Sequence, residues 1–472
     1  MEFQAIILCG PGRGLEPLVS PLPKALLPIA NKPMLYYPLE WCQRGGISSA
    51  IVVAHPSAEQ AVSQYIKLAY NSTQKSPMRV EVVAMEGETG FIVRSLKDKI
   101  KHDLIVVPCD FITDVPPQTV IDIHRNQPVN TIGTAVFYKN TIDAIDNKSF
   151  KPNLTLHSPL SRPHPELLDT FSRPKENDEL RIRMTLLWEH PQTIITTTFL
   201  ESFIYLFSRR VLELDLTLEG SSISSSSSGT DSAVADSLTQ SSYDLSVWKK
   251  PWGTVVRDIA RQSWKHGSSR DQNAVGFYPV PKEHLFIRCD SLTAYFEANR
   301  IMLKQAPYTV PPASATSRGA GIGRDSLVGI GTEMDEKTNV KRSIIGSDCK
   351  FGRECRISGC VIMDGVVLGN NVILDNCVIA NGVMIEDRAR LTGCTVEGRY
   401  IVAKGTQSKN EILRGYSEDN LFDSDEDEFE DGVSDDDDSD DDDFDAEVNE
   451  SDLEASDGEG IDDDDDDLFD RS

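Results

Sequence analysis

The sequence lacks the features of several common protein classes. No run of 18 consecutive apolar residues occurs, so no membrane-spanning helix is predicted. The chain begins Met1-Glu2-Phe3 without a basic segment, and the apolar run that follows is too short for a secretory signal. Its nine cysteines are odd in number and contain no C-x-x-C pair, which does not favour a disulfide framework. These absences predict a cytosolic chain.

Basic residues are almost missing from the C-terminal segment. From Glu418 onward, 31 of the 75 acidic residues occur against one basic residue, Arg471, so this segment carries a charge of -30. The whole chain carries -28, which leaves +2 for residues 1–417. The body is nearly neutral, and it has no basic stripe with interleaved aromatic residues, so direct nucleic-acid binding is not predicted.

The acidic segment 415–472 has few apolar residues to bury and is predicted to be disordered. We interpret it either as a solubilising extension or as a docking segment for a lysine-rich partner, because phenylalanines lie among its acidic residues. Several serines have an acidic residue three positions later, where an acid-directed kinase could add charge. The phenylalanines are Phe422, Phe429, Phe444 and Phe469, and the serines are Ser424, Ser434, Ser439, Ser451 and Ser456.

Glycine is concentrated in a short N-terminal loop. Residues Phe3 to Leu8 form an apolar run with the length of a buried strand, and Gly10, Gly12 and Gly14 follow closely. Glycine has no Cβ atom, so such a loop can bring backbone N–H groups close to a phosphate. The pattern also fits an ordinary turn between a strand and a helix, and it matches neither a P-loop nor a dinucleotide fingerprint.

The loop and the residues after it carry a more specific signal. Residues 9–33, CGPGRGLEPLVSPLPKALLPIANKP, resemble the signature of the nucleotidyltransferases that make nucleotide-sugars, G-G-x-G-T-R-L-x-P-L followed by P-K-x-L-x-P-V-x-x-K-P. Cys9 aligns with the first glycine, and Gly14 stands where active relatives carry an arginine that stabilises the leaving pyrophosphate. The resemblance implies a nucleotide site that retains Gly10, Gly12 and Lys24 but lacks the catalytic arginine.

The same resemblance implies an incomplete metal site. The predicted strand from Asp103 to Pro108 ends at Cys109-Asp110, where the family has Gly-Asp and its aspartate holds the metal. Arg288 aligns with the second metal carboxylate, and a guanidinium cannot ligate a cation. We interpret Lys24 and Asp110 as remnants of the site or, without any nucleotide role, as a turn lysine and an exposed aspartate. We predict no catalytic residue, no metal and no cofactor.

A 17-residue repeat predicts a second domain. Three apolar positions per repeat are typical of a triangular β-solenoid, and the pattern resembles the left-handed β-helix of sugar-nucleotide enzymes and acyltransferases. Acyl transfer by that fold uses a histidine base, and the last histidine, His284, precedes the repeats. We interpret Cys360, Cys377 and Cys394 as a stacked ladder and not as a metal site. The apolar columns are Ile345, Ile362, Ile379 and Val396; Phe351, Leu368 and Ile385; and Ile357, Leu374 and Leu391.

Between the loop and the repeats, short apolar strands alternate with helical stretches. This alternation predicts an α/β domain with a Rossmann-like, mostly parallel sheet. The predicted order is a nucleotidyltransferase-like domain over 1–305, interrupted by a serine-rich insertion over 221–242, a linker over 306–325, the left-handed β-helix over 326–414 and the acidic tail over 415–472.

This organisation resembles the gamma subunits of eukaryotic translation initiation factor 2B. The resemblance rests on the loop without arginine, on Cys109-Asp110, on the run from Tyr295 to Asn299 and on the close of the repeats at Asn410-Glu411. It implies a non-catalytic subunit that supports the epsilon subunit in a complex promoting GDP/GTP exchange on translation initiation factor 2. The implied partners are the epsilon, alpha, beta and delta subunits and factor 2 itself, without direct contact to nucleic acid or membrane.

Two alternatives remain open. An active sugar-phosphate nucleotidyltransferase, such as a mannose-1-phosphate guanylyltransferase, has the same two domains but needs the residues replaced at Gly14 and Arg288. A binding protein could hold a nucleotide or sugar-nucleotide through its backbone without turning it over.

Overall fold

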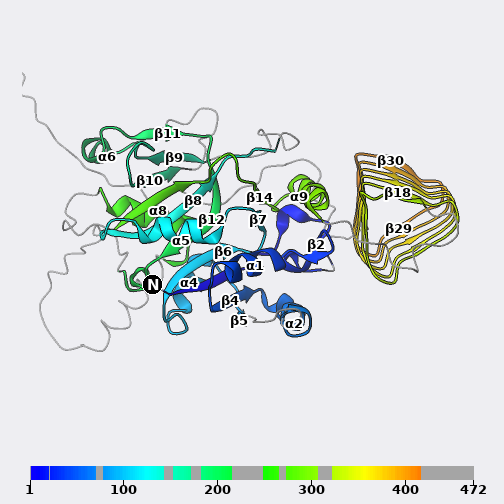
Figure 1. Ribbon diagram of the computed structural model, residues 1–472, viewed down its shortest axis with the longest axis horizontal. Coiled ribbons are helices and arrows are strands. Elements are labelled where there is room, and N and C mark those ends of the chain that lie inside the picture. The colour runs from blue at the N-terminus through cyan, green and yellow to red at the C-terminus, as the bar shows by residue number, and fades with distance from the viewer. Residues whose placement is uncertain are drawn as a thin grey trace, which may run out of the picture. The chain divides into compact units, whose positions relative to one another are not determined.

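The computed structural model describes residues 2–20, 22–70, 78–142, 153–171, 182–214, 248–264, 273–306 and 321–415. The predicted serine-rich insertion, residues 307–320 of the predicted linker and residues 416–472 of the predicted acidic tail lie outside these ranges. Residues 1–415 form one compact unit. The described part of this unit contains an α/β domain followed by stacked short strands (Figure 1).

A ten-stranded sheet forms the centre of the α/β domain, in the order β11-β9-β10-β13-β8-β12-β6-β1-β4-β5 (Figure 1). Strands β5, β4, β1 and β6 run parallel to one another, and so do β8 and β13. Strand β12 joins the two groups by antiparallel pairing with β6 and β8. The strands are β1 (Phe3–Leu8), β4 (Ser49–Ala54), β5 (Arg79–Ala84), β6 (Asp103–Pro108), β8 (Thr131–Tyr138), β9 (Leu154–His157), β10 (Glu166–Phe171), β11 (Ile194–Thr196), β12 (Leu200–Phe207) and β13 (Ala274–Pro279).

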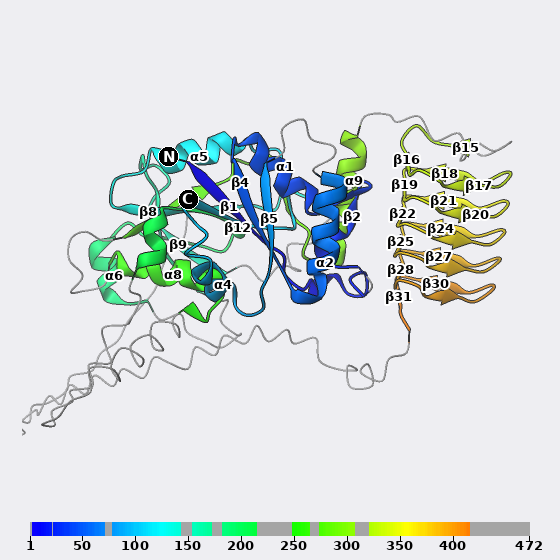
Figure 2. The ribbon, with the colours of Figure 1, turned by 90° about the horizontal axis from the view of Figure 1, so that it is seen from below.

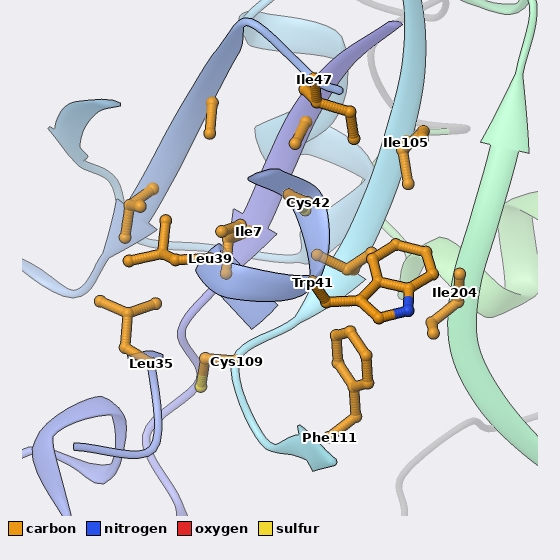
Figure 3. Packing of buried hydrophobic residues seen from close by; sticks show 14 of the residues in the cluster. Ile7, Leu35, Leu39, Trp41, Cys42, Ile47, Ile105, Cys109, Phe111 and Ile204 are labelled. Atoms are coloured by element: carbon orange, nitrogen blue, oxygen red, sulfur yellow. The ribbon is translucent and has the colours of Figure 1, made fainter. Parts of the chain in front are cut away.

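Helices cover both faces of this sheet. Side chains alternate along a strand, so Ile7 of β1 packs with α1, α2 and α5 on one face, and Ile6 packs with α4 and α8 on the other. Figure 3 shows the first face, where Trp41 of α1 lies edge-on to Phe111 with ring centres 5.6 Å apart. The helices are α1 (Tyr36–Arg44), α2 (Pro56–Tyr65), α4 (Thr89–Ser95), α5 (Pro117–Arg125), α6 (Met184–Glu189), α8 (Trp252–Gln262) and α9 (Leu292–Gln305).

Two small antiparallel pairs lie beyond the carboxyl ends of β1 and β6. Strand β7 (Phe111–Thr113) follows β6 after a two-residue turn and pairs with β14 (Phe286–Arg288), so Phe111 lies opposite Arg288. Strands β2 (Pro28–Ile29) and β3 (Lys32–Pro33) form a hairpin within the signature segment. These pairs bring residues that are distant in the sequence to the same edge of the main sheet.

The repeats form a β-helix of three parallel sheets (Figure 2). Each strand pairs with the strand 17 residues later, as Ile357 does with Leu374 and Leu374 with Leu391. The sheets are β15-β18-β21-β24-β27-β30, β16-β19-β22-β25-β28-β31 and β17-β20-β23-β26-β29. Their strands are β15 (Gly321–Ile322), β16 (Leu327–Val328), β17 (Glu333–Met334), β18 (Asn339–Lys341), β19 (Ile344–Ile345), β20 (Lys350–Phe351), β21 (Arg356–Ser358), β22 (Val361–Ile362), β23 (Val367–Leu368), β24 (Ile373–Asp375), β25 (Val378–Ile379), β26 (Met384–Ile385), β27 (Arg390–Thr392), β28 (Thr395–Val396), β29 (Ile401–Val402), β30 (Gln407–Lys409) and β31 (Ile412–Leu413).

The corners of the β-helix repeat with the same period. Left-handed backbone recurs at three positions of each coil, in residues that include glycine, asparagine and longer side chains. One corner column is Gly331, Asp348, Gly365, Gly382 and Arg399; another is Lys337, Glu354, Asn371, Arg388 and Gly405; the third is Arg342, Gly359, Asn376, Gly393 and Asn410. These turns separate the strands within each coil. The coil length of 17 residues is therefore set by the turns as well as by the apolar core.

The structure confirms an α/β domain followed by a parallel β-helix with 17-residue coils. Cys360, Cys377 and Cys394 are buried in the core of the β-helix, where Cys377 N donates to Cys360 Sγ at 3.4 Å. Among the described residues, no helix has the length and apolar character needed to cross a bilayer.

Candidate functional site

The glycine-rich loop begins where β1 ends. Cys9 N donates to Val53 O at 2.9 Å, which extends the pairing of β1 with β4 by one residue. Gly12 then adopts a φ of 82°, and a Cβ atom there would lie 2.9 Å from Lys24 Cβ. A short 3-10 turn, η1 (Arg13–Leu15), follows. Both the backbone conformation and the approach of Lys24 therefore require glycine at position 12.

Lys24, Asp110 and Arg288 meet beyond the loop, and we call them the Asp110 cluster. Lys24 Nζ lies 2.6 Å from Asp110 Oδ2. Arg288 donates from Nε to Oδ1 at 2.7 Å and from Nη2 to Oδ2 at 3.1 Å. The Asp110 side chain is 2% exposed, so the alternative interpretation as an exposed aspartate is wrong. The pairing of β7 with β14 brings Arg288 to Asp110, 178 residues away in the sequence. The pattern of predicted strands did not reveal this contact.

The charges in the Asp110 cluster stabilise one another. Burial alone would raise the pKa of Asp110, but Arg288 and Lys24 outweigh burial and hold it well below its usual range. Burial would lower the pKa of Lys24 and of Arg288, and Asp110 raises both. The three groups are therefore ionised together at neutral pH, with two cations on one carboxylate.

Arg288 places a positive charge against the carboxylate of Asp110. In the nucleotidyltransferases that this chain resembles, the aligned aspartate holds a metal ion. The planar guanidinium of Arg288 makes two hydrogen bonds to Asp110, the bidentate geometry in which arginine matches a carboxylate. The ring of Phe203 covers it, with its centre 4.6 Å from the guanidinium carbon. Within the described residues, no group of three or more histidine, cysteine, aspartate or glutamate side chains is arranged to hold a metal ion.

Phe203 reaches this position through an irregularity in β12. The pairing with β8 shifts between Glu201 and Ile204, and Phe203 has a φ of 57°. Such a bulge turns a side chain away from the regular alternation of the strand. Left-handed backbone is uncommon for a bulky residue, and the sequence gives no signal for it. No pattern in the sequence therefore points to Phe203.

Gly14 allows the loop to pass close to Asp290, two residues after the end of β14. A Cβ atom at position 14 would lie 2.2 Å from Asp290 O. Any side chain at this position thus requires the backbone of the loop or of residues 289–291 to move. The present packing therefore leaves no room for a side chain at the position that aligns with the family's arginine.

Three cysteines surround the Asp110 cluster. Burial raises the pKa of the Cys289 thiol, and Cys289 N donates to Asp110 O at 2.7 Å. Cys9 and Cys109 directly follow the paired strands β1 and β6, so the two residues lie side by side. Figure 3 shows Cys109 beyond the end of β6, among the buried residues that pack below α1.

The signature segment also contacts the β-helix. Leu27 and Ile29 are buried in a cluster with Val361 and Val378 of the second β-helix sheet. Asn31 donates from its side-chain amide to Ile345 O at 2.8 Å. The retained P-K-x-L-x-P pattern therefore has a packing role in this chain that does not depend on a nucleotide.

The structure brings Lys24 and Asp110 together and places Gly12 directly against Lys24. Gly10 lies apart from these contacts, because a Cβ atom there would meet nothing within 4 Å. Arg288 was singled out only as a misfit to a metal site. The structure shows that Arg288 donates two hydrogen bonds to Asp110 and so belongs to the cluster.

Comparison with family models supports both domains. Residues 4–144 match the nucleotidyl transferase family, and residues 308–408 match the family described as the eIF2B subunit epsilon LbH domain, a left-handed β-helix. The predicted hand of the β-helix is thereby confirmed.

Curated relatives extend the similarity along the chain. The translation initiation factor eIF2B subunit gamma of Schizosaccharomyces pombe is 28% identical over 72% of this chain and 74% of its own length. The Dictyostelium discoideum gamma subunit is 24% identical over 45% of this chain and 52% of its own. The eIF2B subunit epsilon of S. pombe is 31% identical over 26% of this chain and 19% of its own. The resemblance inferred from the sequence is confirmed: with a nucleotidyltransferase-type domain ahead of a left-handed β-helix, this chain is similar to the gamma subunits of translation initiation factor eIF2B.

Proposed function

We propose that this chain is a non-catalytic, gamma-type subunit of the eIF2B complex. In this role it supports an epsilon subunit in promoting GDP/GTP exchange on translation initiation factor 2. Similarity to gamma subunits over most of the chain supports membership of the complex. The observation that carries the non-catalytic assignment is the bidentate contact of Arg288 with Asp110.

The chemistry of nucleotidyl transfer explains why that contact matters. The leaving pyrophosphate needs a divalent cation and a nearby arginine to balance its growing charge. In this chain Asp110 is already neutralised by Lys24 and Arg288, and position 14 lacks room for an arginine side chain. We infer that Gly10, Gly12, Lys24 and Asp110 are the remains of a nucleotide site, and that Gly12, Lys24 and Asp110 now serve packing.

The proposed partners follow from this assignment. The chain would assemble in the cytosol with epsilon, alpha, beta and delta subunits and contact factor 2 as the substrate of the complex. Its contribution is then the placement of a catalytic domain that another subunit carries.

Mass analysis of the native assembly tests the proposal. We expect the tagged full-length chain, purified from its own cells at mild salt, to retain an epsilon-type chain in fixed stoichiometry. The purified chain alone should release no pyrophosphate from nucleoside triphosphates and sugar phosphates with Mg²⁺ present. Recovery as a homo-oligomer that releases pyrophosphate would replace the proposal with an active sugar-phosphate nucleotidyltransferase.

A further inference from the structure

Two cysteines stand at positions that the nucleotidyltransferase signature fills with glycine. Cys9 aligns with the first glycine of the loop, and Cys109 aligns with the glycine of Gly-Asp. Each replacement adds a thiol at the edge of the sheet next to the Asp110 cluster. The two replacements also meet in space, which single-position comparison does not reveal.

Strand pairing places the two cysteines side by side. Leu8 of β1 pairs in parallel with Pro108 of β6, so Cys9 and Cys109 are the next residues along the two strands. Cys109 N donates to Leu8 O at 3.1 Å, which keeps the chains together at this point. Both side chains pack on the same face of the sheet. Adjacent strands lie about 4.8 Å apart, within the range of about 4.4–6.8 Å between Cα atoms of disulfide-bonded cysteines.

The two thiols differ in access. Cys9 is half-buried. The next residue, Gly10, is exposed, and a Cβ atom built on it would have open space around it, with nothing within 4 Å. Cys109 is 1% exposed and lies behind Cys9 in the core. Cys9 is therefore the more exposed of the two residues, and Cys109 is placed to react with Cys9.

We propose that Cys9 and Cys109 form a modification site, at which a low-molecular-weight disulfide of the glutathione type converts them into an intramolecular disulfide. The neighbouring Cys109 thiol and burial raise the pKa of Cys9, so Cys9 reacts through its thiolate fraction. This thiolate attacks the reagent, forming a mixed disulfide and releasing one thiol. The Cys109 thiolate then attacks Cys9 Sγ, and the second thiol leaves. Two electrons pass from the cysteines to the reagent, whose two sulfurs are released as thiols carrying the two protons. The bond links the glycine-rich loop covalently to the strand that ends at Asp110.

The test uses the folded full-length chain incubated with oxidised glutathione. Free thiols are then blocked, the unreduced chain is digested, and its peptides are identified by mass spectrometry. We expect a cross-linked peptide pair containing Cys9 and Cys109, which disappears when reduced glutathione is added. Cys109→Ser should accumulate a stable mixed disulfide on Cys9. Cys9→Ser should leave Cys109 unmodified, because no reagent reaches it.

Matched controls separate this site from general oxidation. Cys289→Ser and Cys42→Ser remove buried thiols near the same site, and both variants should give the Cys9-Cys109 cross-link in the same yield as the parent chain. A persistent glutathione adduct on Cys9 in the parent chain, or a cross-link of Cys9 to any other cysteine, would overturn the proposal. The test reads a covalent bond in the isolated chain, so its result does not depend on the assembly proposed above.

Discussion

Arg288 and Asp110 hold opposite charges in a place where water is largely excluded. Their side chains are 10% and 2% exposed, so neither charge is well solvated. A buried pair with good geometry is close to neutral for stability as a whole, but removing one partner leaves the other charge buried. The consequence of substitution is therefore much larger than the net value of the pair.

Arg288→Ala should destabilise the α/β domain by about 3 kcal/mol, since Asp110 would retain only Lys24. Urea unfolding followed by tryptophan fluorescence measures the change, because all five tryptophans lie within residues 41–264. The control is Arg300→Ala on α9, whose arginine is 45% exposed and pairs with Glu297. That variant should change stability by less than about 0.5 kcal/mol. Equal effects of the two substitutions would contradict the account of the Asp110 cluster.

His124 of α5 makes stability depend on pH. Burial lowers the pKa of His124 to about 4, and its ring lies 2.9 Å from Thr134 Oγ1. The folded state therefore resists protonation more than the unfolded state, whose histidine titrates at about 6.5. Stability from this group is complete above pH 6.5 and is lost as pH falls toward 4.

Between pH 7 and pH 5, His124 should cost the α/β domain about 2 kcal/mol of stability. The measurement compares urea unfolding of the parent chain and of His124→Gln at both pH values. The variant should lose less stability on acidification than the parent chain does. A parallel pH dependence of parent and His124→Gln would show that other groups are responsible.

At the scale of the element, the β-helix depends on its corner residues. Gly382 has a φ of 67°, and a Cβ atom there would lie 3.6 Å from Arg399 Cγ, an ordinary contact. Arg388, in another corner column, has a φ of 62° with a long side chain. The two positions therefore isolate backbone conformation from crowding.

Gly382→Ala should destabilise the β-helix by about 1 kcal/mol, because a Cβ atom disfavours left-handed backbone. Arg388→Gly should stabilise it by about 0.5 kcal/mol, since removing this strain outweighs the added freedom of the unfolded chain. Thermal unfolding followed by circular dichroism measures both changes. Effects of the same sign at the two corners would rule out backbone conformation as the cause.

The sequence predicted these elements where the pattern is local or periodic. The 17-residue period was visible because Ile357, Leu374 and Leu391 each point into the core one coil apart. The corner column through Arg388 was not visible in the sequence, because residues that rarely adopt left-handed backbone, such as lysine, glutamate and arginine, occupy it. In the site, Lys24 and Asp110 were found by their signatures. Phe203 was not, since a bulge in β12 placed it over Arg288.

At the scale of the whole described unit, the α/β domain and the β-helix share a buried cluster. Val378 is 5% exposed and packs with Leu27 and Ile29 of the signature segment. Val367 of β23 lies on another sheet of the same β-helix and is 36% exposed. The two valines offer the same substitution inside and outside the contact between domains.

Val378→Asp should uncouple the two domains, because it places an unpaired charge in an apolar contact. Calorimetry should change from one cooperative transition in the parent chain to two separate transitions in this variant. Val367→Asp should keep the single transition, because its carboxylate remains in water. Two transitions in both variants, or in neither, would show that the cluster does not couple the domains.

The contact of Arg288 with Asp110 also bears on the history of the site, on the view that the chain descends from an active enzyme. A return to catalysis would require an arginine at position 14, where the first side-chain atom meets Asp290 O, and a carboxylate at position 288 beside Asp110. The first change alone crowds the loop, and the second alone buries two like charges with Lys24 as the nearby cation. Each single step lowers stability before the other is in place, so under the non-catalytic assignment proposed above neither change by itself leads back to an active site.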